Sequence, residues 1–167
     1  MTMKILLATV PVEPTFQKES PISRSEGIFG ILPKIAIVSL VHWMEKHGYS
    51  SDMYDYYDID MTLPSDEEFI EYLKEYQPTI VGLSAVVSTS YKFTKEISLL
   101  VKKELPETII MVGGNLAASA EILIKQTGVD FCVLGEGETI LLNFMNKVDE
   151  VGLDLQYYKD IKGYYKG

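Results

Sequence analysis

The sequence predicts an α/β fold in which five parallel strands form an open sheet of order 2-1-3-4-5, with helices on both faces. Five apolar runs of strand length recur along the 167 residues. Most of these runs are apolar almost without alternation, as is usual for strands that helices cover on both sides. Segments with helical spacing separate the runs, so strand and helix alternate, and right-handed crossovers then give a doubly wound sheet.

The expected strands are short and rich in Val, Ile and Tyr, which favour β-structure. They cover residues 4–10, 51–57, 79–83, 108–112 and 130–134. Strand and helix alternate five times, and the helices with a readable stripe lie around residues 35–47, 65–77, 93–101 and 140–148, the last being the fifth helix. The second helix has the clearest limits, because Ser65 and Glu68 form a capping box at its start and Pro78 stops it. Core packing explains the apolar stripes of these helices, so the stripes indicate no function.

Composition excludes several classes of function. Fifteen Lys and Arg against 24 Asp and Glu give a net charge of -9, the wrong sign for binding nucleic acid or an anionic membrane. The single cysteine, Cys132, forms neither an internal disulfide nor an all-cysteine metal cluster, and it lies in the middle of an apolar strand. We therefore expect a buried, unreactive thiol. With no signal peptide or membrane span recognisable, we expect a cytoplasmic protein.

Ligands of open parallel sheets bind beyond the carboxyl ends of the strands, so the loops there are the candidate site. The first loop, residues 11–33, is long and rich in Pro and Gly, which indicates either a functional loop or a disordered lid. Ser84 ends the third strand and is expected to face the cleft. The hydroxyls of residues 88–90 either contact a ligand or cap the next helix.

The fourth strand is followed directly by Gly113, Gly114 and Asn115. Two successive glycines permit positive φ and the close approach of a ligand, but a plain turn needs the same freedom. Both interpretations stay open at this stage.

The fifth strand is followed by Gly135, Glu136, Gly137 and Glu138, at the start of the last helix. The N–H groups of a helix N-terminus bind carboxylates, amides or phosphates. Glu138 in the first turn suits the helix dipole on structural grounds alone. Three neighbouring loops of small residues predict a wide, shallow cleft for a large planar or extended ligand.

Several sequence signals are missing. No Gly-x-Gly-x-x-Gly motif follows the first strand, which argues against a dinucleotide. The first loop lacks a cradle for a flavin phosphate, and the tips of the first and third strands lack the aspartates of a receiver domain. His42 and His47, on the first helix, are interpreted as surface or packing residues. No Ser–His or Cys–His pair has a catalytic spacing.

At these residues the chain resembles the N-terminal cobalamin-binding domain of class B radical S-adenosylmethionine enzymes, over roughly residues 3–150. The most specific block is the stretch 133–138. Cobalamin domains carry a Ser-x-Leu motif some way before a Gly-Gly pair. Here Ser84-Ala85-Val86 precedes Gly113-Gly114 with 26 residues (87–112) between, and Val86 replaces the leucine.

The resemblance implies a flavodoxin-like domain at residues 1–150 that binds cobalamin, and a linker at residues 151–167 toward a radical S-adenosylmethionine barrel. The cofactor-binding residues that it implies are Ser84, Val86, Ser88, Gly113, Gly114, Asn115, Gly135, Glu136 and Gly137. The Asp-x-His-x-x-Gly motif, whose histidine ligates cobalt from below, is absent. We therefore expect no metal ligand from this chain.

The cysteine motif of the radical enzymes is also absent, so the iron–sulfur cluster and S-adenosylmethionine would belong to a further domain. These residues alone are then a binding module, and the parent protein a methyltransferase-like radical enzyme. The alternative is a scaffold of the same family that binds no cofactor and serves as an interaction surface. The missing histidine motif favours the scaffold, whereas the spacing from Ser84 to Gly114 favours the cobalamin module.

Overall fold

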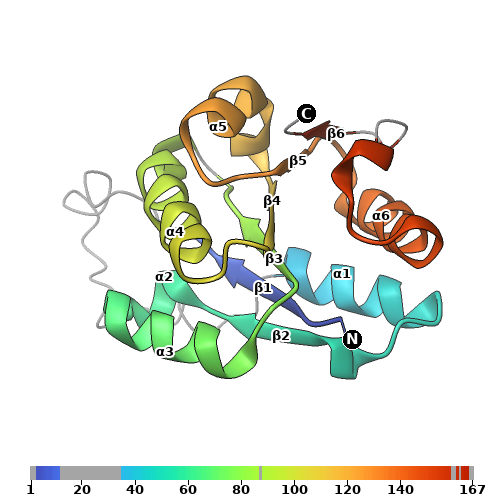
Figure 1. Cartoon of the computed structure of the whole chain (residues 1–167), viewed down its shortest axis with the longest axis horizontal. Helices are drawn as coiled ribbons and strands as arrows, with labels where there is room; N and C mark the ends of the chain where they lie inside the picture. The colour runs from blue at the N-terminus through green and yellow to red at the C-terminus, as the bar shows by residue number, and fades with distance from the viewer. Residues whose placement is uncertain (1–2, 12–34, 87, 159–160, 162, 166–167) are drawn as a thin grey trace.

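The computed structural model describes residues 3–11, 35–86, 88–158, 161 and 163–165, which form a sheet of order β2-β1-β3-β4-β5-β6 (Figure 1). The parallel strands are β1 (Ile5–Thr9), β2 (Tyr54–Tyr57), β3 (Ile80–Ser84), β4 (Ile109–Gly113) and β5 (Phe131–Val133). The predicted five-stranded parallel sheet of order 2-1-3-4-5 is therefore confirmed. A sixth strand, β6 (Gly163–Tyr165), adds antiparallel to β5.

Helices cover both faces of this sheet (Figure 1). One face carries α1 (Ile35–Lys46) and α6 (Gly137–Val151). The other carries α3 (Asp66–Tyr76), α4 (Tyr91–Glu104) and α5 (Ala120–Gln126). Short helical segments complete the described chain: η3 (Ser51–Met53), α2 (Ile59–Thr62), η4 (Ser88–Ser90), η5 (Asn115–Ser119) and η6 (Leu155–Tyr157).

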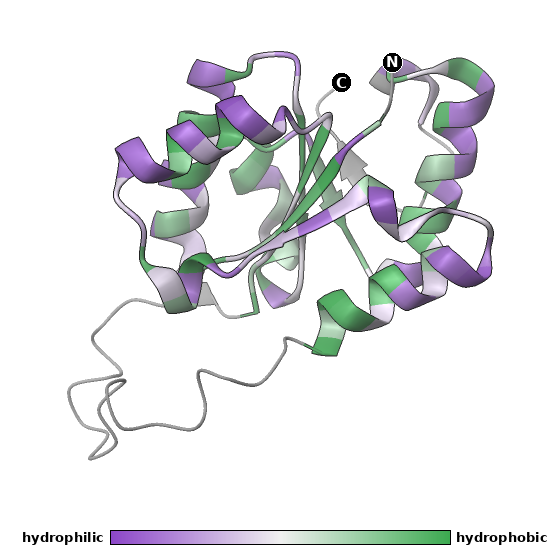
Figure 2. Cartoon of the chain, turned by 90° about the horizontal axis from the view of Figure 1, so that it is seen from below, coloured by the Kyte–Doolittle hydropathy of each residue, from purple (hydrophilic) through white to green (hydrophobic). Residues whose placement is uncertain are grey.

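The two-sided cover explains why the strands are apolar almost without alternation. In β1, Leu6 and Ala8 pack into the core under α3 to α5, whereas Ile5 and Leu7 pack into the core under α1 and α6. Successive side chains of a strand point to opposite faces, so both sets must be apolar. Figure 2 shows the result as hydrophobic strands between helices whose hydrophilic residues face outward.

The limits of α3 follow from the capping box that the sequence predicts. Ser65 Oγ accepts the N–H of Glu68 at 3.2 Å, and Glu68 Oε2 accepts the N–H of Ser65 at 2.8 Å. At the other end, Gln77 takes a left-handed conformation with φ 54° directly before Pro78. The capping box satisfies backbone N–H groups at the start of the helix, and the left-handed residue before Pro78 ends its series of hydrogen bonds. Both features involve only residues close together in the chain, so the sequence alone could locate this helix.

One segment differs from the sequence-based expectation. Residues 51–53, expected to begin the second strand, form a 3-10 turn because Ser50 Oγ and Ser50 O accept the N–H groups of Asp52 (3.3 Å) and Met53 (3.1 Å). Between β4 and β5, where the fivefold alternation predicted a helix without giving its bounds, η5 and α5 pack Leu116, Leu123 and other apolar residues onto the sheet.

The segment after α6 does not simply leave the domain. The ring of Tyr158 is buried, with its centroid 4.5 Å from that of Phe144, and β6 then pairs with β5. Aromatic burial thus returns this segment to the sheet edge. Its interpretation as a linker toward a further domain stays a prediction.

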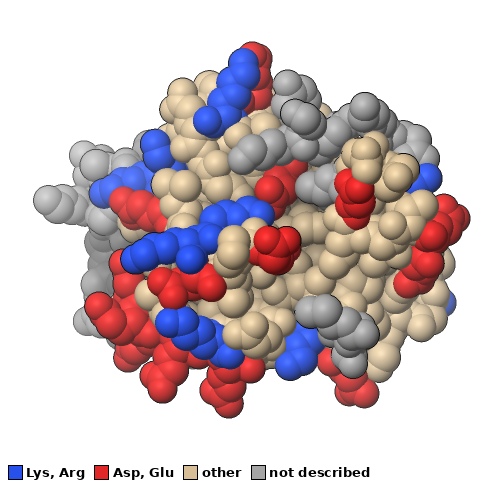
Figure 3. All heavy atoms as spheres, viewed as in Figure 1, with Lys and Arg blue, Asp and Glu red and all other residues tan. Residues whose placement is uncertain are grey.

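The surface carries both signs of charge. Figure 3 shows acidic side chains gathered over α3, beside lysines over α4, and Lys74 Nζ of α3 lies 3.0 Å from Glu104 Oε2 of α4. Among the described residues, none of the helices combines the length and the apolar composition that a membrane crossing requires. The long first loop that the sequence singles out, residues 11–33, lies outside the described residues apart from Pro11.

Candidate functional site: a cavity at the carboxyl ends of the strands

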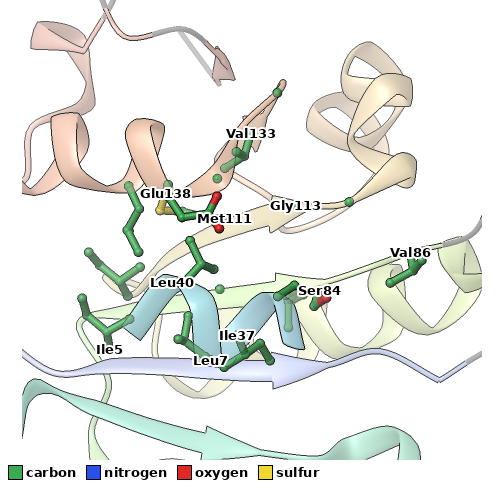
Figure 4. A pocket seen from close by; sticks show the side chains of 18 of the residues that line it. Ile5, Leu7, Ile37, Leu40, Ser84, Val86, Met111, Gly113, Val133 and Glu138 are labelled. Atoms are coloured by element: carbon green, nitrogen blue, oxygen red, sulfur yellow. The ribbon is translucent and has the colours of Figure 1, made fainter. Parts of the chain in front are cut away.

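A cavity of about 360 Å³ opens between the sheet and the α1 and α6 layer, toward the carboxyl ends of the strands (Figure 4). Its wall is mostly apolar. Large apolar residues from four strands and both helices form this wall: Ile5, Leu7, Ile37, Leu40, Ile80, Met111, Val133 and Leu141.

The strand register makes the cavity deep. Ser84 lies opposite Gly113 at the mouth, Gly82 lies opposite Leu7 two residues below, and Ile80 forms the inner end. These residues of β3 share one face, because every second side chain points the same way. At about 3.3 Å of rise per residue, the four steps from Ser84 to Ile80 span about 13 Å. The site is therefore a deep slot, not the shallow cleft that the loop sequences suggest.

The two glycines after β4 have different roles. A β-carbon on Gly113 would have no heavy atom within 4 Å, so the absence of a side chain leaves this part of the mouth open. Gly114 has φ +90°, and a β-carbon there would lie 2.5 Å from the carbonyl oxygen of Ala85. The requirements of a turn thus explain why position 114 is glycine. The glycine at position 113 instead leaves space at the mouth of the cavity.

Ser84 is the hydroxyl at the mouth. Its side chain is partly buried, and no group among the described residues hydrogen-bonds its hydroxyl. Thr9, its neighbour across the ladder, differs in this respect, because Thr9 Oγ1 donates to Asp58 Oδ1 at 2.7 Å. Ser84 therefore retains a hydrogen-bonding capacity toward the cavity that the surrounding fold does not use.

Two hydrogen-bonded bridges set the spacing of α1 and α6. Ser39 Oγ donates to Glu138 Oε1, on the cavity wall, at 2.7 Å. Beyond the other end of α1, the Tyr49 hydroxyl lies 3.0 Å from Asn146 Oδ1 and 2.9 Å from Asp149 Oδ2. Burial, with a further contribution from Asp149, raises the pKa of Tyr49 to about 12, so the hydroxyl remains a donor at neutral pH.

Most of the residues that sequence analysis assigned to a site line this cavity. Those that do are Ser84, Val86, Gly113, Gly114, Asn115, Gly135 and Gly137. Glu136, directly before α6, is not among the described lining residues, and the side chain of Ser88, in η4, lies outside what the structure describes. Assignment of these positions to a ligand stays a prediction.

Sequence reasoning missed the inner wall. The residues of β1, β4 and α1 that form it were read as core, and Glu138 was assigned to the helix dipole alone. Alternation along β1 and β3 could have put Leu7 and Gly82 on one face, but no local signal separates an apolar residue that lines a cavity from one that fills a core.

Neither histidine of the sequence lines the cavity. His42 and His47 are both exposed on or just after α1, and the His47 ring contacts the Trp43 ring with centroids 4.7 Å apart and planes tilted by 38°. In the described ranges, no three His, Cys, Asp or Glu side chains come together in a group that could hold a metal ion. Cys132 is fully buried in β5, as expected, and burial raises its pKa to about 12.

Comparison with known proteins gives the site a context. The family model of the B12 binding domain matches residues 27–144. The anaerobic magnesium-protoporphyrin IX monomethyl ester cyclases of Cereibacter sphaeroides and Rubrivivax gelatinosus are 29% and 28% identical, over 81% and 74% of this chain. The cytidylyl-2-hydroxyethylphosphonate methyltransferase of Streptomyces wedmorensis is 26% identical over 64% of the chain.

The fold is also that of a domain in a solved structure, the apo form of the cobalamin-dependent S-adenosylmethionine radical enzyme OxsB. The two superpose with a TM-score of 0.63 at 19% identity, over 96% of this chain and 20% of that one. This chain likewise spans 22% of the length of each cyclase and 23% of the methyltransferase. It therefore corresponds to a single part of each of these proteins.

Proposed function

The chain belongs to the B12 binding domain family, and from that premise we propose that it binds cobalamin with the nucleotide tail inserted in the cavity between the sheet and α1 and α6. The observation that carries this proposal is the cavity itself: a slot of about 360 Å³ with an apolar wall, an open mouth at Gly113 and an unused hydroxyl at Ser84. A flat aromatic base fits the apolar depth, and the polar part of the tail fits the mouth.

The residues present suit such a tail. Ser84 would donate a hydrogen bond to a tail oxygen, and Gly113 would let the tail approach the backbone of β4. Asn115, Gly135 and Gly137 would contact the tail from the neighbouring loops. When bound, cobalamin supplies methyl-transfer or radical-assisting chemistry, and the protein supplies shape and orientation.

We further propose that no histidine of this chain ligates the cobalt from below. Both histidines of the sequence are exposed and lie outside the cavity. Replacing His42 and His47 with alanine should leave the absorption spectrum of the bound cobalamin unchanged. A shift of that spectrum in either variant would contradict this assignment.

The larger setting is also a proposal. Because the similar cyclases and methyltransferase are more than four times as long as their matching part, we propose that this domain presents cobalamin to a radical S-adenosylmethionine domain. Residues 151–167 would lead toward that domain, which would hold the iron–sulfur cluster and S-adenosylmethionine. We also propose that the protein is cytoplasmic and that the parent enzyme is methyltransferase-like or cyclase-like.

A visible absorption titration with hydroxocobalamin and methylcobalamin tests the central claim. We expect a saturable spectral change, and co-elution of cobalamin with the protein on a sizing column. If the folded chain shows neither at high micromolar cobalamin, the cofactor-free scaffold replaces the cobalamin module.

A further inference from the structure

Among the described residues that line the cavity, Glu138 is the one with a charged side chain. Resting on the function proposed above, we propose that the Glu138 carboxylate shares a single proton with a basic ring nitrogen of the inserted nucleotide base. The cavity then selects corrinoids with an imidazole-type base over corrinoids with a phenolic base.

The position of the carboxylate is defined by its partner on the facing helix. Glu138 is the second residue of α6 and is partly buried, and its Oε1 accepts a hydrogen bond of 2.7 Å from Ser39 Oγ of α1. Its Oε2 has no partner among the described residues. Figure 4 shows the Glu138 side chain on the cavity wall near Met111 and Leu40. One carboxylate oxygen is thus fixed, and the other is available to a ligand.

Among the described residues, Glu138 has no other charged side chain beside it on the cavity wall. Its neighbours on the wall are apolar, among them Leu40, Met111 and Leu141. The nearest titratable groups along the chain are Glu136, two residues before it, and His42, one turn beyond Ser39 on α1, and neither lines the cavity. A ligand that fills the cavity and excludes water leaves the carboxylate poorly solvated unless it brings a hydrogen-bond donor.

The chemistry of the nucleotide base determines whether the ligand can bring a hydrogen-bond donor to the Glu138 carboxylate. A benzimidazole or other imidazole-type base that is glycosidically linked through one ring nitrogen carries a lone pair, but no hydrogen, on the other. Two acceptors that face each other repel, whereas one proton taken from solvent and held between nitrogen and carboxylate oxygen satisfies both. In free hydroxocobalamin this nitrogen is bonded to cobalt, so that bond must break, with water taking the place of the base, before the nitrogen can hold the proton. Binding then takes up one proton. A phenolic base has no basic nitrogen and cannot hold that proton.

The test measures the pH dependence of binding by the 167-residue chain. For hydroxocobalamin we expect the affinity of the unmodified chain to fall with pH by up to about tenfold per unit above neutrality, as linkage to one bound proton requires. A cobamide with a p-cresol base should bind at least tenfold more weakly at pH 6. Calorimetry in two buffers of different ionisation enthalpy should report uptake of about one proton per cobalamin bound.

Three variants separate the role of Glu138 from general disruption. Glu138→Gln presents an amide N–H to the ring nitrogen without needing a proton, so its binding should be independent of pH. Ser39→Ala loses only the helix bridge and should retain proton uptake. Glu67→Gln, exposed in the first turn of α3 on the other face of the sheet, is the matched control and should behave as the unmodified chain. Thermal unfolding of each variant confirms that it is folded.

The outcomes distinguish this inference from the function on which it rests. If Glu138→Gln keeps the pH dependence, or the p-cresol cobamide binds as tightly as hydroxocobalamin, the role of Glu138 is overturned while cobalamin binding stands. If no corrinoid binds, or if cobinamide, which lacks the nucleotide, binds as tightly as hydroxocobalamin, the proposed placement of the tail itself fails.

Discussion

Gly114 lies so close to Ala85 that a β-carbon at position 114 would come within 2.5 Å of the Ala85 carbonyl oxygen. The same contact region is held by hydrogen bonds, because the N–H of Ala85 donates to Gly113 O at 3.0 Å and the N–H of Leu116 donates to Ala85 O at 3.2 Å. The loops after β3 and β4 are thereby joined into one rim. The lack of a side chain at Gly114 allows the two loops of that rim to approach each other. The lack of a side chain at Gly113 keeps the mouth of the cavity open.

This difference predicts opposite effects of substitution at the two glycines. Gly113→Val should reduce cobalamin affinity at least roughly tenfold, because its methyl groups occupy the open mouth and overpacking typically costs 1–3 kcal/mol. Its unfolding free energy should stay the same or rise slightly, since no atom opposes the new β-carbon and valine favours strands. Absorption titration and denaturant unfolding measure the two quantities.

Gly114→Ala is the control for this pair. It should lower the unfolding free energy by roughly 2 kcal/mol or more, because φ +90° disfavours a side chain and the Ala85 backbone cannot move aside easily. If Gly113→Val binds cobalamin as the unmodified chain does, the tail does not pass this part of the mouth.

Ser84→Ala should weaken cobalamin binding about fivefold, the equivalent of about 1 kcal/mol for one hydrogen bond. The stability of the free protein should not change, because no described residue hydrogen-bonds the Ser84 hydroxyl. Thr9→Val, on the same row of the sheet, should show the reverse, since it loses the bond to Asp58 but does not line the cavity. Equal affinity of Ser84→Ala and the unmodified chain would remove Ser84 from the site.

Cys132 should resist thiol reagents in the folded protein. Burial raises its pKa to about 12 from a usual value of 9.0, so the reactive thiolate is scarce at pH 8. The folded state favours the neutral thiol, and the corresponding stability is lost as pH rises from about 9 to about 12. A colorimetric thiol assay should detect little reaction in buffer and one thiol per chain in denaturant. Rapid labelling of the native protein would contradict the buried position.

Asp130→Ala should lower the unfolding free energy by about 1–3 kcal/mol, because the buried N–H of Ile110 loses its side-chain acceptor and Lys102 loses its ion pair, keeping only backbone carbonyl acceptors. Asp130 Oδ2 accepts from Ile110 N at 2.9 Å and from Lys102 Nζ at 2.7 Å, at the amino-terminal end of β4 and β5. Glu121→Ala, which breaks the exposed pair with Lys125, should change stability far less and serves as control. Chemical denaturation compares the two, and equal effects would show that burial of Asp130 adds nothing.

Sequence reasoning was most successful where the physical signal is local or periodic. The capping box of Ser65 and Glu68 spans four residues, and the two-sided burial of β1 appears directly as a continuous apolar run. It was less successful at residues 51–53, where hydrogen bonds to Ser50 overrode the pattern of apolar residues. Between β4 and β5 the alternation predicted a helix but not its bounds.

The sequence by itself therefore determined the alternation of strands and helices, the parallel sheet and the edge at which Ser84 and Gly113 meet. The tertiary structure alone decided that a cavity exists there and that Glu138 lies on its wall beside Ser39, 99 residues away along the chain. Whether two apolar surfaces close into a core or leave a slot depends on the distance between α1, α6 and the sheet. That distance results from contacts between residues far apart in sequence, and no short stretch of residues encodes it.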